Sequence, residues 1–359
     1  MVLSNYIEIS KNAIRHNAKT VCNSIEVPVI GVVKCNGYGA TVSEAAAAWH
    51  EAGVCMFGVS RPEEALELRG AGYAEDIILL TPISDTNALY KMIDNRIILT
   101  VGSLYDAQLY SLYSYNIPIR VHIAVDTGMG RFGINWKDLM QIKAIYNIFG
   151  LQVTGIFSHF AKSYEKNYIL TKKQLGRFLY VTESLQAAGI KPGLRHIANS
   201  CAALRFPETH LDAVRIGSAL VRQPSRVSSV SIQPVATFKA QVIACKYFQP
   251  GDRCGYGLQY RIKKHTKAAI VSLGSIDGFG QMNEPGHLGV KDLILHTAHT
   301  VKKWLYPPYV TFKENSLPLL GQIGNQHTLF DATGTDIAPG DTVQWYGRLM
   351  LCGSERVFV

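Results

Sequence analysis

The sequence predicts an α/β protein in which an N-terminal (β/α)8 barrel of the TIM type is followed by a C-terminal all-β domain. Over the first two thirds of the chain, apolar β-branched segments alternate with helical segments. Beyond about residue 224, short strand-like segments are separated by Gly and Pro turns. A chain of 359 residues with 47% hydrophobic and 18% charged residues can bury two cores. We therefore expect a barrel over residues 1–225 and a β domain over 226–359, with the first ten or so residues packing on the β domain.

In the barrel region, eight strand candidates alternate with helical segments. The strand candidates are Val27–Val33, Met56–Val59, Ile77–Leu80, Arg96–Leu99, Ile119–Val125, Val153–Phe157, Arg195–Ile197 and Ala213–Ile216. The helical segments are Thr41–Ala52, Arg61–Ala71, Asp85–Asp94, Leu104–Tyr115, Trp136–Phe149, Leu170–Ala188 and Cys201–Arg205. Their number and order fit a (β/α)8 barrel, whose usual size is about 250 residues.

The β domain is predicted from five further strand candidates. They are Pro234–Ala244, Ala268–Ser272, Tyr309–Phe312, His327–Phe330 and Thr342–Trp345. Turn sequences such as Pro250-Gly251 and Pro339-Gly340 separate them. No internal repeat accompanies them, so one catalytic barrel with an appended β domain is the simplest interpretation.

Composition excludes several classes of protein. The net charge of +9 is spread along the chain, and its densest cluster, Arg261 to Lys267, has no nucleic-acid motif beside it. Neither a signal peptide nor an uninterrupted apolar stretch of about 18 residues occurs, so we expect no membrane segment in this chain. The seven cysteines are scattered without a CxxC pair, which predicts reduced thiols, no metal site and a cytoplasmic location.

Lys34 stands at the most informative position of the chain. It directly follows the apolar segment Val27–Val33, and turn residues from Asn36 to Gly39 come next. A lysine at the end of a buried strand loses hydration and needs a partner. The carboxyl ends of parallel strands are also where α/β folds place catalytic groups. From this stretch alone, Lys34 is either a lysine whose amine reaches solvent or a reactive amine.

Five segments in order give a resemblance to a known family. They are Val33-Lys34-Cys35-Asn36-Gly37-Tyr38-Gly39, Val125-Asp126-Thr127-Gly128-Met129-Gly130-Arg131-Phe132-Gly133, His196-Ile197-Ala198-Asn199-Ser200, Val214-Arg215-Ile216-Gly217-Ser218-Ala219-Leu220 and Cys254-Gly255-Tyr256-Gly257-Leu258-Gln259-Tyr260. Together they closely resemble the motifs of the alanine racemase family, fold-type III enzymes that use pyridoxal 5'-phosphate (PLP). The resemblance extends from about Asn5 to Arg356.

The resemblance implies a binding site for PLP in the barrel. Lys34 would form the Schiff base with the cofactor and later act as a base at the substrate α-carbon. The cofactor phosphate would be held by Tyr38, Ser200 and the backbone of Gly217 and Ser218. Taken alone, Gly217 also suits a plain turn.

The resemblance also implies how the cofactor ring and the second catalytic base are held. Arg215 would face the ring nitrogen, although a salt-bridged structural arginine is the alternative. Tyr256 matches the family's second base, which acts on the other face of the α-carbon in the active site of the other subunit. His159 and His196 match the groups that link the tyrosine to the arginine, and either could instead be a structural histidine. A head-to-tail homodimer with composite active sites follows.

Substrate binding is where the chain departs from the family pattern. Arg131 would steady the substrate carboxylate and the PLP hydroxyl, or form part of a structural turn. Ala124 stands where many members have a lysine aimed at that arginine, so Arg131 needs another orienting partner, for which an anion is one candidate. Ser275 replaces an entrance tyrosine, and Asn325, within the altered segment 322–327, replaces a methionine near the carboxylate. These changes predict an enlarged or more polar pocket.

We therefore expect a PLP-dependent amino-acid racemase that interconverts the L- and D-forms of alanine, or of serine or a larger or basic amino acid. The two bases are Lys34 and Tyr256 of the other subunit. A fold-type III decarboxylase is the first alternative, but its late Gly-rich phosphate loop and Cys-Asp motif are not found. The second alternative is a PLP-binding paralogue without turnover. By analogy with the family, the pathway would be the supply of D-amino acids to the cell wall.

Overall fold

The computed structural model describes residues 4–115, 117–223, 230–281 and 305–359, together with positions 289, 293, 297, 300 and 301. The chain divides into two compact units, which are Lys11–Val235 and the combination of Met1–Ser10 with Ala236–Val359. The domain boundary expected at 225/226 lies outside the described residues.

The unit Lys11–Val235 contains eight parallel strands. The strands are β2 (Val29–Val32), β3 (Met56–Val59), β4 (Asp76–Leu79), β5 (Leu99–Val101), β6 (Ile119–Asp126), β8 (Leu151–Phe157), β9 (Leu194–His196) and β10 (Val214–Ile216). They pair in the orders β10-β2-β3-β4 and β5-β6-β8-β9. Parallel bridges between Ile78 and Ile98 and between His196 and Ala213 join the two sheets into a closed barrel. The predicted (β/α)8 barrel is confirmed.

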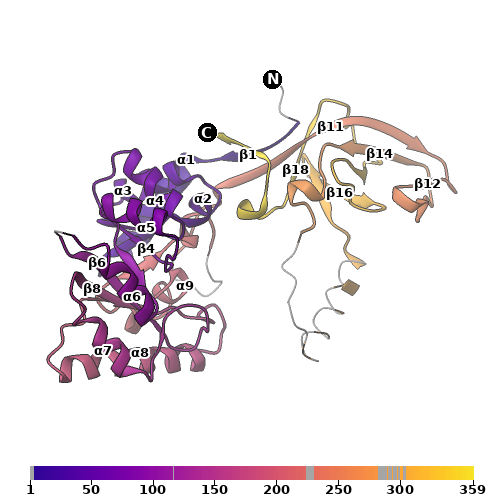
Figure 1. Cartoon of the computed structure of the whole chain (residues 1–359). Helices are drawn as coiled ribbons and strands as arrows, with labels where there is room; N and C mark the ends of the chain where they lie inside the picture. The colour runs from indigo at the N-terminus through magenta and orange to yellow at the C-terminus, as the bar shows by residue number, and fades with distance from the viewer. Residues whose placement is uncertain are drawn as a thin grey trace. The chain divides into compact units, whose positions relative to one another are not determined.

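Helices connect the strands of the barrel (Figure 1). They are α1 (Lys11–Asn23), α3 (Val42–Glu51), α4 (Pro62–Gly70), α5 (Thr86–Asp94), α6 (Leu104–Ser111), α7 (Leu139–Ile145), α8 (Ile169–Ala187) and α9 (Ser200–Ala203). Shorter elements are α2 (Lys34–Tyr38), β7 (Ile134–Asn135) and the 3-10 turns η1 (Pro207–Thr209) and η2 (Ser218–Leu220). Polar N-caps begin several helices: Asp85, for example, accepts a hydrogen bond from the Ala88 N–H at 2.6 Å. The sequence did not predict α1.

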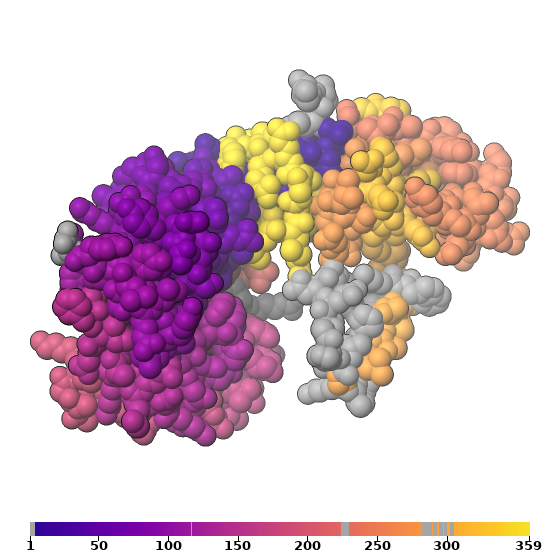
Figure 2. All heavy atoms as spheres, viewed as in Figure 1, coloured from indigo at the N-terminus to yellow at the C-terminus, as the bar shows by residue number. Residues whose placement is uncertain are grey.

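The interior of the barrel is filled by side chains from strands all around the ring. Six buried residues pack together there, and they are Ile30, Ile78, Ile98, Ala124, Phe157 and Ala213. Because they belong to different strands of a closed ring, they fill its centre and leave no channel. In the space-filling view the barrel residues, coloured indigo to pink, form a continuous packed surface (Figure 2). The barrel thus serves as a rigid support for groups at its strand ends.

The second unit is built almost entirely from strands. They are β1 (Asn5–Ile9), β11 (Ala236–Phe248), β12 (Arg253–Cys254), β13 (Tyr260–Arg261), β14 (Thr266–Val271), β15 (Tyr309–Phe312), β16 (Asn315–Leu320), β17 (Thr328–Asp331), β18 (Thr342–Trp345) and β19 (Glu355–Phe358). The order β14-β17-β16-β15-β18-β11 closes on itself, because β11 also pairs with β14. β1 pairs with β11 and β19 and so ties the start of the chain to this unit. Short turns η3 (Tyr256–Leu258), η4 (Ser275–Asp277) and η5 (Leu349–Leu351) complete it.

Within the described residues, none of the helices is long and apolar enough to cross a membrane.

Candidate active site

The predicted site residues of the barrel follow the carboxyl ends of its strands. Lys34 follows β2, His159 follows β8, His196 ends β9 and Arg215 lies in β10. Arg131 belongs to the loop that leaves β6. The carboxyl ends of parallel strands meet at one face of a barrel, so the fold brings these residues together. The hydrogen bonds and charge effects below connect them directly.

Lys34 is half-buried and carries a perturbed amine. Burial lowers the pKa of Lys34 from its ordinary value, and the nearby positive charges of Arg131 and Arg215 lower it further. The Cys35 thiol acts in the opposite direction. A larger neutral fraction at physiological pH makes the amine a better nucleophile towards an aldehyde. A lowered pKa is the property that the reactive-amine interpretation of Lys34 requires.

The segment after Lys34 is a left-handed turn. Cys35, Asn36 and Tyr38 have φ values of 55°, 53° and 57°, in a region that residues with a β-carbon rarely adopt. The Gly37 N–H donates to the Val33 carbonyl at 2.9 Å, which holds the turn against the strand end. This conformation returns the chain so that the Tyr38 ring lies over Gly217, where a β-carbon would come within 2.4 Å of the tyrosine hydroxyl oxygen.

Tyr38, Ser200 and Gly217 form a small polar group at the start of η2. The Gly217 N–H donates to the Ser200 Oγ at 3.0 Å. The hydroxyl protons of Ser200 and Tyr38 thus remain as donors for an anion, while the backbone of Gly217 serves Ser200. Neutral donors next to a glycine that allows close approach suit a phosphate group.

Arg215 is almost fully buried, with 4% of its surface exposed, and it is fixed by several acceptors. Its Nη1 donates to the His196 Nδ1 at 2.5 Å and to the His196 carbonyl at 3.0 Å. Its Nη2 donates to the Ser158 carbonyl at 2.6 Å and contacts the Ile197 carbonyl and the His159 Nδ1 at 3.2 Å each. Among the described residues, no hydrogen bond uses Nε, so this N–H is left for a ligand. Burial lowers the pKa of Arg215 to about 9, and the guanidinium stays charged at neutral pH.

A third histidine, which sequence reasoning missed, extends this network. His122 on β6 lies with its Nδ1 2.9 Å from the His196 Nε2. Its ring is 1% exposed. The one signal in the sequence was a histidine between the apolar residues Val121 and Ile123 of a predicted strand.

Asp126 builds the loop that carries Arg131. Its Oδ1 accepts hydrogen bonds from the backbone N–H groups of Gly128, Met129 and Gly130 at 2.8, 2.9 and 3.1 Å. Three donors on one carboxylate oxygen fix the loop tightly. The described residues give the Arg131 side chain neither an ion pair nor a hydrogen bond, so its charge is available to a carboxylate.

Two residues of α8, also missed by sequence reasoning, hold this loop from outside. The buried Gln174 donates to Thr127 Oγ1 at 3.2 Å and to the His159 carbonyl at 3.1 Å, and it accepts from the Ala161 N–H at 2.9 Å. Arg177 donates to the Thr127 carbonyl at 2.7 Å. Gln174 therefore connects the segment that carries Arg131 with the segment that carries His159. Nothing in the helical pattern of α8 distinguished either residue beforehand.

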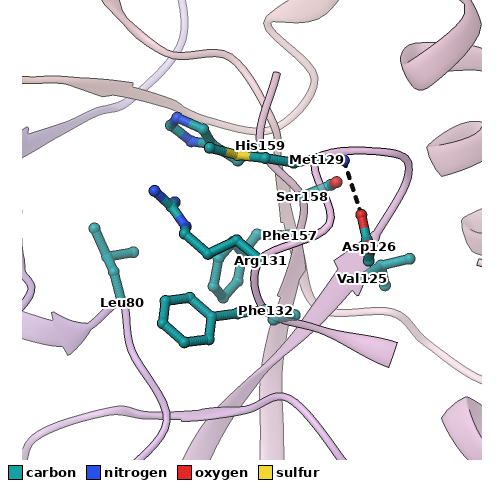
Figure 3. A pocket seen from close by; sticks show the side chains of 10 residues that line it. Leu80, Val125, Asp126, Met129, Arg131, Phe132, Phe157, Ser158 and His159 are labelled. Carbon is teal, nitrogen blue, oxygen red and sulfur yellow. Dashed lines mark hydrogen bonds between the residues drawn. The ribbon is translucent and has the colours of Figure 1, made fainter. Parts of the chain in front are cut away.

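A cavity of about 30 Å³ lies beside Arg131, large enough for a water molecule or a small ion. Figure 3 shows the Arg131 side chain extending into it between Phe132 and His159, with Leu80 opposite. Its lining residues are Leu80, Ala124, Val125, Asp126, Met129, Arg131, Phe132, Phe157, Ser158 and His159. Ala124, the residue at the position of the family's lysine, is therefore part of the cavity wall.

Tyr256 and Asn325 belong to the β unit. Tyr256 is 74% exposed at the start of η3, and the preceding Gly255 contacts the Gly321–Gln322 backbone. Asn325 packs its backbone against Gly274, where a β-carbon would lie 2.0 Å from the Asn325 carbonyl oxygen. The segments around Tyr256 and Ser275 therefore both lie next to the segment 322–327.

The described part of the chain contains no cluster of three or more His, Cys, Asp or Glu side chains that could hold a metal ion. The donor set of the barrel fits a different group. A lysine of lowered pKa, a free guanidinium N–H in a buried network and two hydroxyl donors match the aldehyde, ring nitrogen and phosphate of PLP. Fold and donor set together fit a barrel enzyme that uses PLP.

Comparisons with known proteins identify the family of this chain. Residues 9–223 match the alanine racemase N-terminal domain, and residues 235–352 match the alanine racemase C-terminal domain. The chain belongs to the alanine racemase family, and it is a PLP-dependent amino-acid racemase.

Individual relatives agree with this assignment. An alanine racemase from Desulfosudis oleivorans is 32% identical over 96% of this chain and 87% of its own length. An amino-acid racemase from Enterococcus faecalis is 32% identical over 76% of this chain but only 40% of its own length. The structure of an alanine racemase from Streptomyces coelicolor A3(2) superposes with a TM-score of 0.84 and 26% identity, covering 100% of this chain and 98% of that one.

Proposed function

We propose that the chain racemises alanine or a related amino acid by a two-base mechanism, with Lys34 as one base and Tyr256 of a second copy as the other. Bound PLP withdraws electrons from the substrate and so acidifies its Cα–H. The neutral Lys34 amine takes or returns the proton on one face of the α-carbon. The observation that carries the proposal is the burial-lowered pKa of Lys34 beside a guanidinium with one free N–H.

The remaining barrel residues hold the cofactor. Tyr38, Ser200 and Ser218 would bind its phosphate, with Gly217 allowing its close approach, and the Arg215 Nε–H would donate to its ring nitrogen. A guanidinium keeps its protons, so the ring nitrogen would stay unprotonated, which limits electron withdrawal and favours proton return over side reactions.

The contact between Arg215 and the His159 ring supports a role for His159 towards the tyrosine base. Because Arg215 can only donate, the His159 Nδ1 is the acceptor in that contact, and a neutral ring then carries its proton on Nε2. Burial and the Arg215 charge lower the pKa of His159 well below its ordinary value, which keeps the ring neutral. We propose that this Nε2–H donates to the Tyr256 oxygen of the second copy and stabilises its phenolate form.

Arg131 and Asn325 would bind the substrate carboxylate. With Ala124 on its wall, the cavity beside Arg131 admits a water or anion that a longer side chain would displace. Ser275 and the segment 322–327 lack the bulk expected of an alanine-specific entrance. We therefore propose that serine or a larger or basic amino acid is accepted besides alanine.

The function is tested by deuterium wash-in at the α-carbon, followed by kcat/KM for L-Ala, L-Ser, L-Lys and L-Arg. Exchange with formation of the D-enantiomer supports a racemase. Release of CO2 would indicate a decarboxylase, and a cofactor absorption band without exchange would indicate a paralogue without turnover. A strong preference for alanine over the other three would refute the broadened substrate range.

The composite site is tested by mixing two inactive variants, Lys34→Met and Tyr256→Phe. A head-to-tail homodimer places both lesions in one site of a mixed dimer and leaves the other site intact. Random mixing should restore about a quarter of the wild-type activity. Two active sites that each use one chain would give no recovery.

Since all seven cysteines are free, a reducing compartment such as the cytoplasm suits the protein, with supply of D-amino acids for the cell wall as its role.

A further inference from the structure

His122 lies at the inner end of the hydrogen-bond network that holds Arg215. The residue sits in the middle of β6, with a ring centroid 5.1 Å from that of His196. On β8, Gly155 leaves room for it, since a β-carbon there would come within 2.6 Å of the imidazole. The fold thus makes space for a histidine ring that contacts neither the cavity nor solvent.

Arg215, which can only donate, sets the donors and acceptors along the network. Arg215 has no acceptor, so the His196 Nδ1 must accept from Nη1. A neutral His196 then carries its proton on Nε2, and this N–H points at the His122 Nδ1 2.9 Å away. His122 Nδ1 is therefore an acceptor, and its own proton lies on Nε2. Protonation of either ring would place two N–H groups face to face.

We propose that His122 is a positioning residue, which fixes His196 in the tautomer whose Nδ1 accepts from Arg215 and thereby keeps the Arg215 Nε–H directed at the cofactor ring. The interpretation rests on the proposed function only for its kinetic consequence. The burial of both rings is consistent with it, because burial and the Arg215 charge lower the pKa of His122 to about 3 and that of His196 well below its ordinary value.

The alternative assignment is costly in this surrounding. Without an acceptor at position 122, the His196 Nε2–H would be buried and unsatisfied in a ring that is 0% exposed. Moving that proton to Nδ1 would direct it at the guanidinium. The first case leaves a buried donor unsatisfied, and the second removes the His196 Nδ1 as an acceptor for Arg215 and so loosens the guanidinium on that side.

The first test is the tautomeric state of the two rings in the PLP-loaded enzyme, read from 15N chemical shifts of histidine-labelled protein. The rings are assigned with the His122→Asn and His122→Leu variants. Both rings should be neutral with the proton on Nε2 from about pH 6 to 9. A proton on Nδ1 of either ring, or an imidazolium, would overturn the proposal. This measurement needs no turnover, so it stands even where no amino acid is racemised.

The second test compares the two variants. In His122→Asn the amide oxygen of the new side chain can replace the Nδ1 acceptor, whereas the leucine of His122→Leu has similar volume and no acceptor. We expect His122→Leu to lower kcat by ~10–100-fold with KM nearly constant, in the range for outer-shell partners of catalytic groups. The absorption maximum of the bound cofactor should shift as well, and His122→Asn should recover most of both effects. Equal losses in the two variants, or wild-type behaviour of His122→Leu, would reduce His122 to a packing residue.

A matched control is His16, an exposed histidine on α1 whose ring contacts Thr20 at 3.3 Å. His16→Leu and His16→Asn should leave kinetics and cofactor absorption unchanged. Where His122→Leu does not fold, the wild-type tautomers and the His122→Asn variant still decide the proposal.

Discussion

Gly217→Ala tests the geometry of the phosphate end of the site. The added β-carbon would lie 2.3 Å from Tyr38 Cε2, 2.4 Å from its hydroxyl oxygen and 2.6 Å from Cζ. Carbon atoms normally approach to about 3.5–4.0 Å, so the tyrosine ring must move by roughly 1 Å or more. Since Tyr38 belongs to the left-handed turn after Lys34, a shift of its backbone would also displace the lysine. Overpacking of this kind costs ~1–3 kcal/mol of the free energy of unfolding.

Because the clash displaces the tyrosine hydroxyl from its donor position, we also expect PLP affinity to fall by ~10–100-fold. The assay is thermal unfolding of the cofactor-free protein together with PLP titration followed by absorbance. Gly70→Ala is the matched control: no atom lies within 4 Å of its β-carbon, and the change should be neutral or slightly stabilising. In a Tyr38→Ala background the cost of Gly217→Ala should vanish. If Gly217→Ala had the same unfolding temperature and the same PLP affinity as Gly70→Ala, the reasoning would be wrong.

Three further variants address Lys34, Arg131 and α8, the helix that holds the loop of Arg131. Since the pKa of Lys34 is lowered in the folded state, the unfolded chain binds more protons, and the stability of the cofactor-free protein should rise with pH up to the ordinary lysine pKa of 10.5. Lys34→Met should lack that rise in Tm. A pH profile of Tm that is the same in Lys34→Met and in the wild type would contradict the lowered pKa. Arg131→Met should raise KM by ~10–100-fold with Tm nearly constant, because no described ion pair or hydrogen bond is lost, and a large fall in Tm would argue for a structural turn. Gln174→Met should lower the free energy of unfolding by ~1–3 kcal/mol and raise KM, because it frees Thr127 and His159; stability loss at constant KM would limit Gln174 to packing.

Secondary structure was predictable where segments were apolar and bounded by turns. Met56–Val59, Tyr309–Phe312 and Thr342–Trp345 were placed with the observed bounds. The strand predicted at Arg96–Leu99 was placed too early, since Arg96 adopts a φ of 54° and β5 begins only at Leu99. β16 was missed because it contains Pro318, which argues against a strand unless its backbone nitrogen faces an edge.

The site was predictable where a polar residue follows a buried strand, as Lys34 does. Residues whose role depends on a partner far along the chain could not be found in this way. His122 is separated by 74 residues from His196, and Gln174 by 47 from Thr127. Neither pairing leaves a local pattern, because the barrel brings strands and helices together by closure and not by sequence proximity.

Cys35→Gly tests whether the left-handed conformation of Cys35 in the turn after Lys34 lowers the stability of the protein. Cys35 has a φ of 55°, its side chain is exposed, and the described residues give it no hydrogen-bond partner. A left-handed conformation costs roughly 1–2 kcal/mol for such a residue, and glycine relieves it at an entropic cost of roughly 0.5–1 kcal/mol. The net expectation is a gain of ~0.5–1 kcal/mol in the free energy of unfolding, measured by denaturant titration of the cofactor-free protein.

The matched control is Asn36→Gly, which relieves a similar φ of 53° but removes the Oδ1 that accepts from the Val42 N–H at 3.2 Å. We expect no net gain there. The Cys35 thiol also raises the pKa of Lys34, so Cys35→Gly should lower that pKa further, as titrated through the rate of amine modification at varied pH. Stabilisation without a change in Lys34 reactivity would mean that the thiol has no electrostatic part in tuning the amine. Destabilisation would mean that the strain assigned to Cys35 is absent, since glycine could then offer no relief.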